Sequence, residues 1–478
     1  MKRKLHYLFP LLLSLPMSWS TSLGAMPSQV RSDSLIHTEA PQPDSAAGLT
    51  NFIRRGYFFG HVRSYWMGTN NRGALQDYHA LALGAGIGYR TARIAGHVEL
   101  GMSGFFMFNV FSSDLAAPDP LTGKGSRYEV GLFNIEEPNN REDLDRLEEL
   151  YIRYYVGRAS RVTVGRQIPA SPFVNPQDGR MRPTLTEGIV LEWNEWKHTR
   201  IRAEYLTRIS PRSTVRWFDI GESIGLLPSG VTTDGQPSRY AGNVESSHLL
   251  MLGITQEIGK LKVNLWETAV PGLFHTAYSR IEWHQPLHLG GEWWLGGQAS
   301  RQWTMGNGGN EEARLVYIDP NHRATVFSGQ AGLQLKRWTW SLNATRITAE
   351  GRFLMPREWG REPFYTFMFR ERNEGLGNVS ALTAGVNYKA GEHWRWEFTA
   401  GTFRLPSVSN TRLNKYSLPS YSQLNLRTVY HFSGLPDGLD AELLFTQKLN
   451  QTGRIIEDKV AQNRVDMNLV NVIVNYHF

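Results

Sequence analysis

Apolar and polar residues alternate with a period of two along most of the chain from residue 56 onward, in stretches of about ten residues. In the last stretch, Val470, Val472, Val474, Tyr476 and Phe478 share one face. An α-helix would instead repeat its apolar positions about every 3.6 residues. The pattern therefore predicts an all-β protein built of extended strands.

Eighteen such stretches can be counted. The predicted strands are 56–66, 78–90, 93–106, 149–157, 160–167, 186–196, 199–208, 247–257, 260–268, 273–285, 290–303, 325–337, 338–349, 378–389, 393–404, 420–432, 438–448 and 466–478. Tight turns alternate with long connections, as expected of an antiparallel barrel with short periplasmic turns and long extracellular loops. The short connection at 269–272 breaks the alternation, so the exact strand count at 257–285 stays open.

Strands of this kind could form a soluble sandwich, but several features favour a transmembrane β-barrel over residues 51–478. Most stretches are about 9 to 13 residues long, close to the tilted span of a bilayer. Aromatic residues gather at their ends, as at Trp193 and Trp196, where interfacial girdles form. The chain ends on Phe478, an ending that resembles the signal by which the bacterial assembly machinery inserts outer-membrane barrels. An eighteen-stranded barrel is wide enough for an aqueous channel.

The amino end has the features of an export signal. Lys2, Arg3 and Lys4 precede an apolar stretch from residue 8 to residue 19, and small residues near Ala25 offer a cleavage site. We therefore predict a signal peptide at 1–25, followed by a disordered leader at 26–50 that is rich in Ser, Pro and Ala. Export without a long apolar helix places the barrel in a bacterial outer membrane.

Composition excludes several classes of protein. The chain has no cysteine, which rules out disulfides, thiolate metal sites and cysteine catalysis. Its mean hydropathy of -0.37 is too polar for a bundle of membrane helices. We expect no cofactor and no metal, and the sequence contains no P-loop, zinc motif or nucleic-acid-binding module.

The formal charge of +7 is supplied mainly by arginine, with 40 Arg against 11 Lys. Alternation turns several of these arginines inward, because an Arg facing lipid at the midplane costs about 2 to 4 kcal/mol. One interpretation is that they pair with Glu192, Glu204, Glu397 and Glu442 and stabilise the wall. The other is a track of positive charge that attracts anions.

The connection at 168–185 is rich in Pro, Gly and Arg, and we predict that this third extracellular loop folds into the barrel. The run from Leu150 to Tyr154, followed by Gly165-Arg166-Gln167, resembles the OprD-type porins of Gram-negative bacteria. The segments Thr255–Pro286 and Asn425–Phe445 are also similar to that family.

The resemblance implies a gated eighteen-stranded channel for small solutes, many of them carboxylates, that pass along lumenal arginines. It also implies the candidate residues for this arginine ladder and its constriction. These are Arg153, Arg166, Arg180, Arg182, Arg200, Arg202, Arg280 and Arg427.

Other constellations support weaker hypotheses. The acidic segment 136–149 could bind a divalent cation, but it lacks EF-hand spacing and is better interpreted as a solvated loop. The charged loop 350–377 is either a surface loop with internal salt bridges or a loop that brings Arg370 and Arg372 to the channel mouth. A barrel hydrolase would need a paired Ser and His, for which Ser247 and His248 offer only adjacency without a nucleophile motif. An adhesin or assembly barrel is a third possibility.

The sequence therefore predicts a passive, non-enzymatic outer-membrane porin for small hydrophilic solutes, favouring anionic ones such as amino acids and organic acids. Its expected partners are outer-membrane lipid, the solutes and the assembly machinery, with no nucleic acid. The solute, the choice between monomer and trimer, and the entry of loops 107–148 and 350–377 into the lumen stay open.

Overall fold

The structure, a computed structural model, describes residues 49–478 apart from 143, 177–179, 289 and 435–436. The predicted signal peptide and nearly all of the predicted leader lie outside the described residues. The leader's last two residues, 49 and 50, begin the short helix α1 (Leu49–Arg54). Among the described residues, no helix has the length and apolar character needed to cross a membrane.

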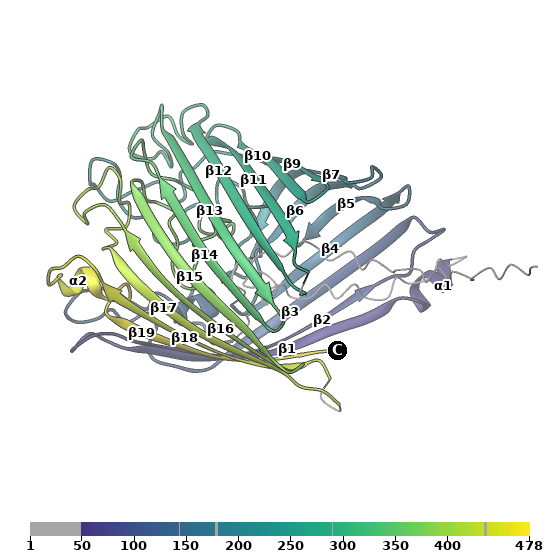
Figure 1. Cartoon of the computed structure of the whole chain (residues 1–478), viewed down its shortest axis with the longest axis horizontal. Coiled ribbons are helices and arrows are strands. Elements are labelled where there is room, and N and C mark those ends of the chain that lie inside the picture. Colours follow the sequence, from purple (N-terminus) through teal and green to yellow (C-terminus); the bar gives the residue numbers. More distant parts are fainter. Residues whose placement is uncertain (1–48, 143, 177–179, 289, 435–436) are drawn as a thin grey trace, which may run out of the picture.

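The described chain forms one closed antiparallel barrel (Figure 1). Its strands are β1 Tyr57–Asn70, β2 Tyr78–Arg90, β3 Val98–Ser112, β4 Leu144–Val156, β5 Ser160–Gln167, β6 Leu185–Trp193, β7 Thr199–Ser210, β9 Leu249–Ile258, β10 Leu261–Val270, β11 Phe274–Pro286, β12 Glu292–Thr304, β13 Arg323–Leu335, β14 Trp338–Ile347, β15 Val379–Ala390, β16 Trp394–Arg404, β17 Tyr421–His431, β18 Leu439–Asn450 and β19 Met467–His477. Each pairs with its neighbours along the chain, and β1 pairs with β19 to close the ring.

These eighteen strands confirm the predicted fold, including three strands in the region 257–285 whose count was open. The remaining strand, β8 (Phe218–Asp219), has two residues and pairs only with the end of β7. Closure leaves no unpaired sheet edge, which a strand surrounded by lipid requires.

The long connections lie at one end of the barrel and tight turns at the other (Figure 1), although the short L5 also lies at the long end. We name the loops at the long end, the loop end, L1 to L9 in chain order. They are L1 71–77, L2 113–143, L3 168–184, L4 211–248, L5 271–273, L6 305–322, L7 348–378, L8 405–420 and L9 451–466. The turn end carries α1 and the last residue, where the backbones of Gly60 and Phe478 exchange two hydrogen bonds of 2.9 and 3.0 Å. Helix α2 (Asp458–Ala461) lies in L9.

The predicted alternation is visible in the exposure of the wall residues. On β9, Leu250, Leu252 and Ile254 are exposed on the outer surface, whereas Leu249 and Met251 between them are buried. Strand β15 shows the same alternation from Val379 to Ala384. Outer apolar side chains suit a lipid environment, so their exposure to the surroundings carries no hydrophobic penalty there.

Two predicted strand starts are wrong in the first part of the barrel. The predicted strand 93–106 is β3, which begins at Val98, because Ala95 and Gly96 both have positive φ (48° and 79°) and turn the chain. Strand β4 begins at Leu144 instead of residue 149. The acidic segment 136–149 is therefore not wholly a solvated loop, since its last two glutamates belong to the wall.

A β-bulge explains those two glutamates. The pairing of β3 with β4 shifts between Met102 and Gly104, so that two consecutive residues of β4 face one of β3. Leu147 and Leu150 are both exposed on the outer surface, and Glu148 and Glu149 between them are both buried inside. The bulge thus directs two neighbouring carboxylates into the interior.

Side chains of three loops are buried against inward-facing residues of the barrel wall. Phe173 of L3, Ile220 of L4 and Trp359 of L7 belong to one buried apolar cluster together with inward-facing wall residues such as Phe274 and Tyr278. The Phe173 ring packs against Tyr278 at 5.5 Å between ring centres. Burial of these large side chains fixes the loops in place, because truncating a buried aromatic residue typically costs about 3 to 5 kcal/mol.

Candidate functional site

The predicted ladder arginines on the strands are mostly inward-facing, and each is paired with a glutamate. Arg153 contacts Glu99 at 2.9 Å and Arg280 contacts Glu282 at 2.6 Å. The other contacts of this kind are Arg202 with Glu192 at 2.9 Å and with Glu204 at 2.5 Å, and Arg427 with Glu442 at 2.5 Å and with Glu397 at 3.1 Å. All these residues alternate with outward apolar residues on the same strands.

These pairs neutralise the wall. Burying an arginine without a partner is far more costly than burying a pair, because the desolvation of one charge is then uncompensated. The pairs include all four glutamates that the sequence offers as partners, so the contacts fit a stabilising role for the wall arginines. A wall of matched charges attracts a passing anion less than the same arginines would alone.

Two predicted candidates on the strands differ from this pattern. Arg166 is not lumenal, which corrects the sequence-based assignment: it lies opposite the outward-facing Leu150 and pairs with Glu187 at 2.8 Å. Strand β5 continues through Gln167, so Arg166 keeps the outward phase of Val164. Arg200 does face inward, but its side chain is half-exposed and its contact with Glu257 is long, at 3.8 Å.

The two predicted candidates in L3 reach across the interior to different elements. The Arg180 guanidinium donates a hydrogen bond to the Tyr128 carbonyl in L2 at 2.6 Å, and the Arg180 carbonyl accepts one from Arg63 of β1. Arg182 pairs with Glu148, contacts His61, and lies 4.0 Å from the centre of the Phe105 ring. Residues 178 and 179 of the predicted motif lie outside the described residues.

Two cavities lie on either side of this part of L3. The turn-end cavity, of about 710 Å³, is lined by Arg182 together with both signs of charge, including Glu148, Glu149 and Asp440. The second, which we call the vestibule, has a volume of about 470 Å³ at the loop end and is lined by Arg180. L3 therefore lies between the turn-end cavity, which carries both signs of charge, and the vestibule.

The vestibule is strongly basic. Eight basic and two acidic side chains are among the described residues that line it. They are Lys124 and Arg127 of L2, Arg180 of L3, Arg212 of L4, Arg357, Arg370, Arg372, Glu371 and Glu374 of L7, and Arg464 of L9. Both L2 and L7 thus contribute residues to the lining of the vestibule.

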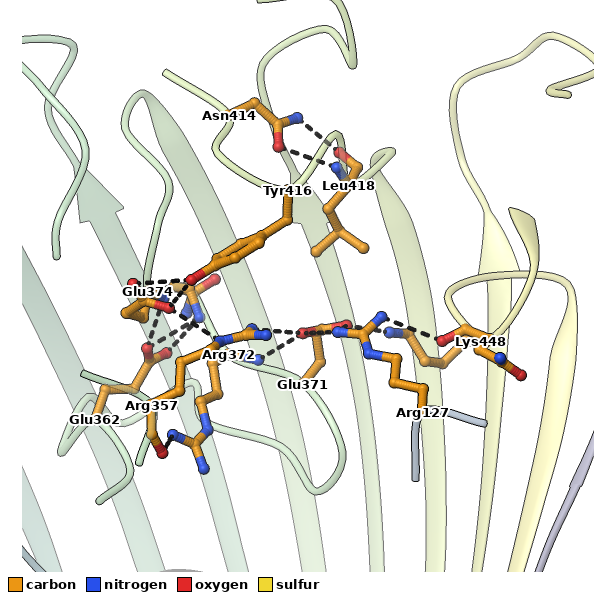
Figure 2. Close-up of polar contacts among 12 residues, drawn as sticks. Arg127, Arg357, Glu362, Glu371, Arg372, Glu374, Asn414, Tyr416, Leu418 and Lys448 are labelled. Carbon is orange, nitrogen blue, oxygen red and sulfur yellow. Dashed lines mark hydrogen bonds and ion pairs between the residues drawn. The ribbon is translucent and has the colours of Figure 1, made fainter. Parts of the chain in front are cut away.

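Glu371 organises the cations of the vestibule (Figure 2). Its carboxylate contacts Arg127 at 3.2 Å, Arg357 at 3.4 Å and Lys448 of β18 at 2.9 Å. Burial alone would raise the pKa of Glu371, but Arg127, Lys448 and Arg357 hold it well below its usual range. Arg357 also contacts Glu374 at 2.9 Å. The carboxylate thus joins L2, L7 and the wall.

A neighbouring acid of L7 behaves differently. Burial raises the pKa of Glu362 to about 7, although the backbone N–H groups of Asn373 and Glu374 donate hydrogen bonds to its carboxylate (Figure 2). Glu362 therefore carries only part of a negative charge at neutral pH and offsets little of the vestibule's positive charge.

The cations of L2 and L9 lie in a field of like charge. Burial and the nearby Arg464 lower the pKa of Lys124 to about 7. Burial and the nearby Arg127 lower the pKa of Arg464 to about 10. Lys124 donates its hydrogen bond to the Lys459 carbonyl, and Arg464 donates one to the Ser417 carbonyl at 3.1 Å. Because neutral carbonyls do not balance these charges, a bound anion would stabilise both residues.

Sequence reasoning missed most of the vestibule. Lys124, Arg127 and Arg464 lie in loops where no alternation indicates a direction, and their neighbours are hundreds of residues away in the chain. The buried Glu148 and Glu149 did have a signal, since Leu147 and Leu150 are spaced by three and so break the period of two.

Metal and hydrolase chemistry receive no support from the described part of the chain. No group of three or more His, Asp or Glu side chains there is arranged to hold a metal ion. Ser247 does contact the His248 ring at 2.9 Å, but the two residues are the last of L4, and the Ser247 side chain is exposed.

Comparisons with known proteins agree with the architecture. Residues 147–353 match the model of the outer membrane porins of the OprD family. Three similar solved structures from Pseudomonas aeruginosa show the same fold. OccK3 (OpdO) has 14% identity, a TM-score of 0.66, and coverage of 90% of this chain and 98% of its own. OccK1 (OpdK) has 13% identity, a TM-score of 0.65, and coverage of 89% and 99%. OccK9 (OpdG) has 12% identity, a TM-score of 0.69, and coverage of 90% and 99%.

The search of curated proteins gives no match. The family model nevertheless covers strands from β4 to β14 together with L3, L4 and L6, where much of the interior is built. Over residues 147–353 the chain thus matches the OprD family of outer membrane porins, a family of substrate-selective channels and not of enzymes.

Proposed function

We propose that this channel conducts small solutes passively and prefers those that carry a carboxylate or another anionic group. The observation that carries the proposal is the vestibule, whose described lining has eight basic and two acidic side chains around about 470 Å³. Such a chamber concentrates anions at the loop end, because clefts lined by one sign of charge raise the local concentration of the opposite ion.

In this proposal the arginine track differs from the predicted ladder. The vestibule supplies the attraction through Lys124 and Arg464, and the paired wall arginines keep the barrel in shape. Repeated weak sites let an anion enter and leave. A solved structure of OpdK, one of the similar proteins, contains vanillate, which is a carboxylate.

We also propose that L3 and L7 together form the constriction. Three contacts support this: Phe173 of L3 packs against Phe364 of L7 at 6.4 Å, Asn175 donates a hydrogen bond to the Arg361 carbonyl at 2.9 Å, and Arg180 contacts L2. The solute would pass from the vestibule to the turn-end cavity beside Arg180 and Arg182.

The exposed C-terminal aromatic residue fits the further proposal that barrel-assembly machinery recognises this chain at its turn end. Phe478 is 62% exposed and shares the outer face of β19 with Tyr476 and Val474.

The preference for anions can be tested by liposome swelling at pH 6, where Lys124 is charged, with nicotinate and its neutral amide, nicotinamide. The variant Lys124→Gln/Arg464→Gln removes two vestibule charges without leaving a buried carboxylate unpaired. An interaction of about 1 kcal/mol per charge corresponds to a factor of about five. We therefore expect the nicotinate rate to fall roughly fivefold or more and the nicotinamide rate to stay the same.

The control is Arg208→Gln/Arg216→Gln, which removes the same charge from exposed ion pairs on the outer rim. It should transport both solutes as the wild type does. Equal rates for nicotinate and nicotinamide in the wild type would contradict the proposal, as would an equal loss in the control.

A further inference from the structure

Strands β14 to β16 lie side by side in the barrel wall (Figure 1). Their outer surface carries exposed arginines next to exposed apolar side chains. Arg346 of β14 lies opposite Ser380 of β15, which lies opposite Arg404 of β16. Residues opposite each other in antiparallel strands point to the same face of the sheet. Phe327 of β13 also lies opposite Arg346 and is 53% exposed, so this face is the outer one.

The spacing of these two arginines suits one tetrahedral anion. They are two strands apart, which corresponds to about 10 Å at the usual strand separation. Two long guanidinium side chains can converge on a group placed over Ser380 between them. Arg346 is already held there, since it donates hydrogen bonds to the Ser380 hydroxyl at 2.9 Å and to the Asn378 side-chain oxygen at 2.6 Å.

A further cation extends this row. Arg412 of L8 donates hydrogen bonds to the carbonyls of Ala349 and Glu350, just beyond the end of β14. The nearby Glu350 carboxylate is already paired with Arg301. Within the described part of the chain, the exposed Arg404 side chain makes neither an ion pair nor a hydrogen bond. The patch therefore carries positive charge that these acidic groups do not balance.

The rim around β5 to β7 provides the contrast. Arg166 pairs with Glu187 there, Arg208 pairs with Asp219, and Arg216 contacts both Glu136 and Glu222. Outward-facing arginines on that side are thus neutralised by the chain itself. By contrast, Arg346, Arg404 and Arg412 are exposed, and within the described part of the chain no ion pair joins any of them to an acidic side chain.

We propose that this patch binds the phosphate of a phosphorylated glycolipid in the outer leaflet of the membrane. Guanidinium groups bind phosphate through two parallel hydrogen bonds and are the preferred side chains for this purpose. Leu382 and Leu342 lie on the same outer face toward the membrane centre and are both exposed, so they can contact the lipid's acyl chains. The polar head group of the lipid would lie over the arginines, and its acyl chains would lie over the exposed leucines.

The test measures binding of lipopolysaccharide to the full-length, detergent-purified channel by the rise in its unfolding temperature. Lipopolysaccharide, its enzymatically dephosphorylated form and inorganic phosphate serve as the three probes. We expect the wild type to bind lipopolysaccharide, and Arg346→Gln/Arg404→Gln to weaken that binding by at least about tenfold. Dephosphorylation of the lipid should weaken binding to the wild type to the same extent.

The matched control is Arg208→Gln/Arg216→Gln, which removes two outward arginines from the neutralised side and should bind as the wild type does. Wild-type affinity in Arg346→Gln/Arg404→Gln would overturn the proposal. Full competition by inorganic phosphate at equal concentration would also overturn it, because the site would then bind free phosphate and not a lipid. Both variants alter exposed side chains, so unchanged unfolding temperatures without lipid confirm that they fold.

Discussion

Glu371→Gln is expected to loosen L7 and enlarge the conducting pathway. The substitution leaves Arg127, Arg357 and Lys448 in the interior without the carboxylate that joins them, and Lys448 is fully buried. Removing one partner of a buried ion pair typically costs about 3 to 5 kcal/mol. The loss falls on the docking of L7 against L2 and β18, because those are the elements that Glu371 connects (Figure 2).

Single-channel recording in planar bilayers measures this effect as a higher conductance with frequent transitions between conductance levels.

The pH dependence of L7 docking follows from the pKa of Glu371. Since the cations hold the pKa of Glu371 below its usual range, its contribution to stability is present above the usual pKa of a glutamate and is lost as pH falls. Acid pH should therefore make the wild type resemble Glu371→Gln.

Glu311→Gln is the control, because it removes the same charge from an exposed position in L6. Wild-type conductance and quiet gating in Glu371→Gln would show that L7 does not depend on this carboxylate.

Arg427→Gln is expected to destabilise the barrel itself. Arg427 is 1% exposed and contacts both Glu442 and Glu397, which are themselves buried. The variant leaves two carboxylates inside without their shared cation, at a cost of about 3 to 5 kcal/mol. The measurement is the temperature at which the folded barrel loses its compact mobility on a gel.

A second variant separates charge from packing. Arg427→Gln/Glu397→Gln/Glu442→Gln removes Arg427 together with both of its partners. It should recover most of the lost stability, because the only charge that loses its partner is Arg395, which is partly exposed and contacts Glu397 at 3.2 Å in the wild type. Arg200→Gln is the comparison at a half-exposed position, where loss of the contact with Glu257 should cost about 1 kcal/mol or less. A triple variant as unstable as Arg427→Gln would contradict the assignment of Arg427 to wall stabilisation.

The strands could be predicted because lipid and water impose opposite demands on the two faces of each one. Val164 and Leu250 face lipid, and no charged residue replaces them without cost, so the alternation in the sequence follows the wall closely. Boundaries were missed where the period is interrupted, at the turn of Ala95 and Gly96 and at the bulge before Leu150. Arg166 was assigned to the lumen through the family resemblance, although its phase with Val164 on the predicted strand 160–167 points it outward.

The site could be predicted only in part, because its charges come from loops. The contact between Arg127 and Glu371 joins residues 244 positions apart, and no local pattern relates them. The inward arginines of the strands were found by alternation. Their glutamate partners were also present in the sequence, but only the register of the sheet shows that Arg202 and Glu192 lie on paired residues.

The central claim is that anion selectivity comes from the vestibule in the loops and not from the paired arginines of the wall. The most direct measurement is the reversal potential of the channel in a planar bilayer under a KCl gradient at pH 6. We expect an anion-selective wild type, a clear shift toward zero in Lys124→Gln/Arg464→Gln, and no shift in Arg280→Gln/Glu282→Gln, which removes a complete wall pair. A shift in the wall variant with none in the vestibule variant would contradict the claim.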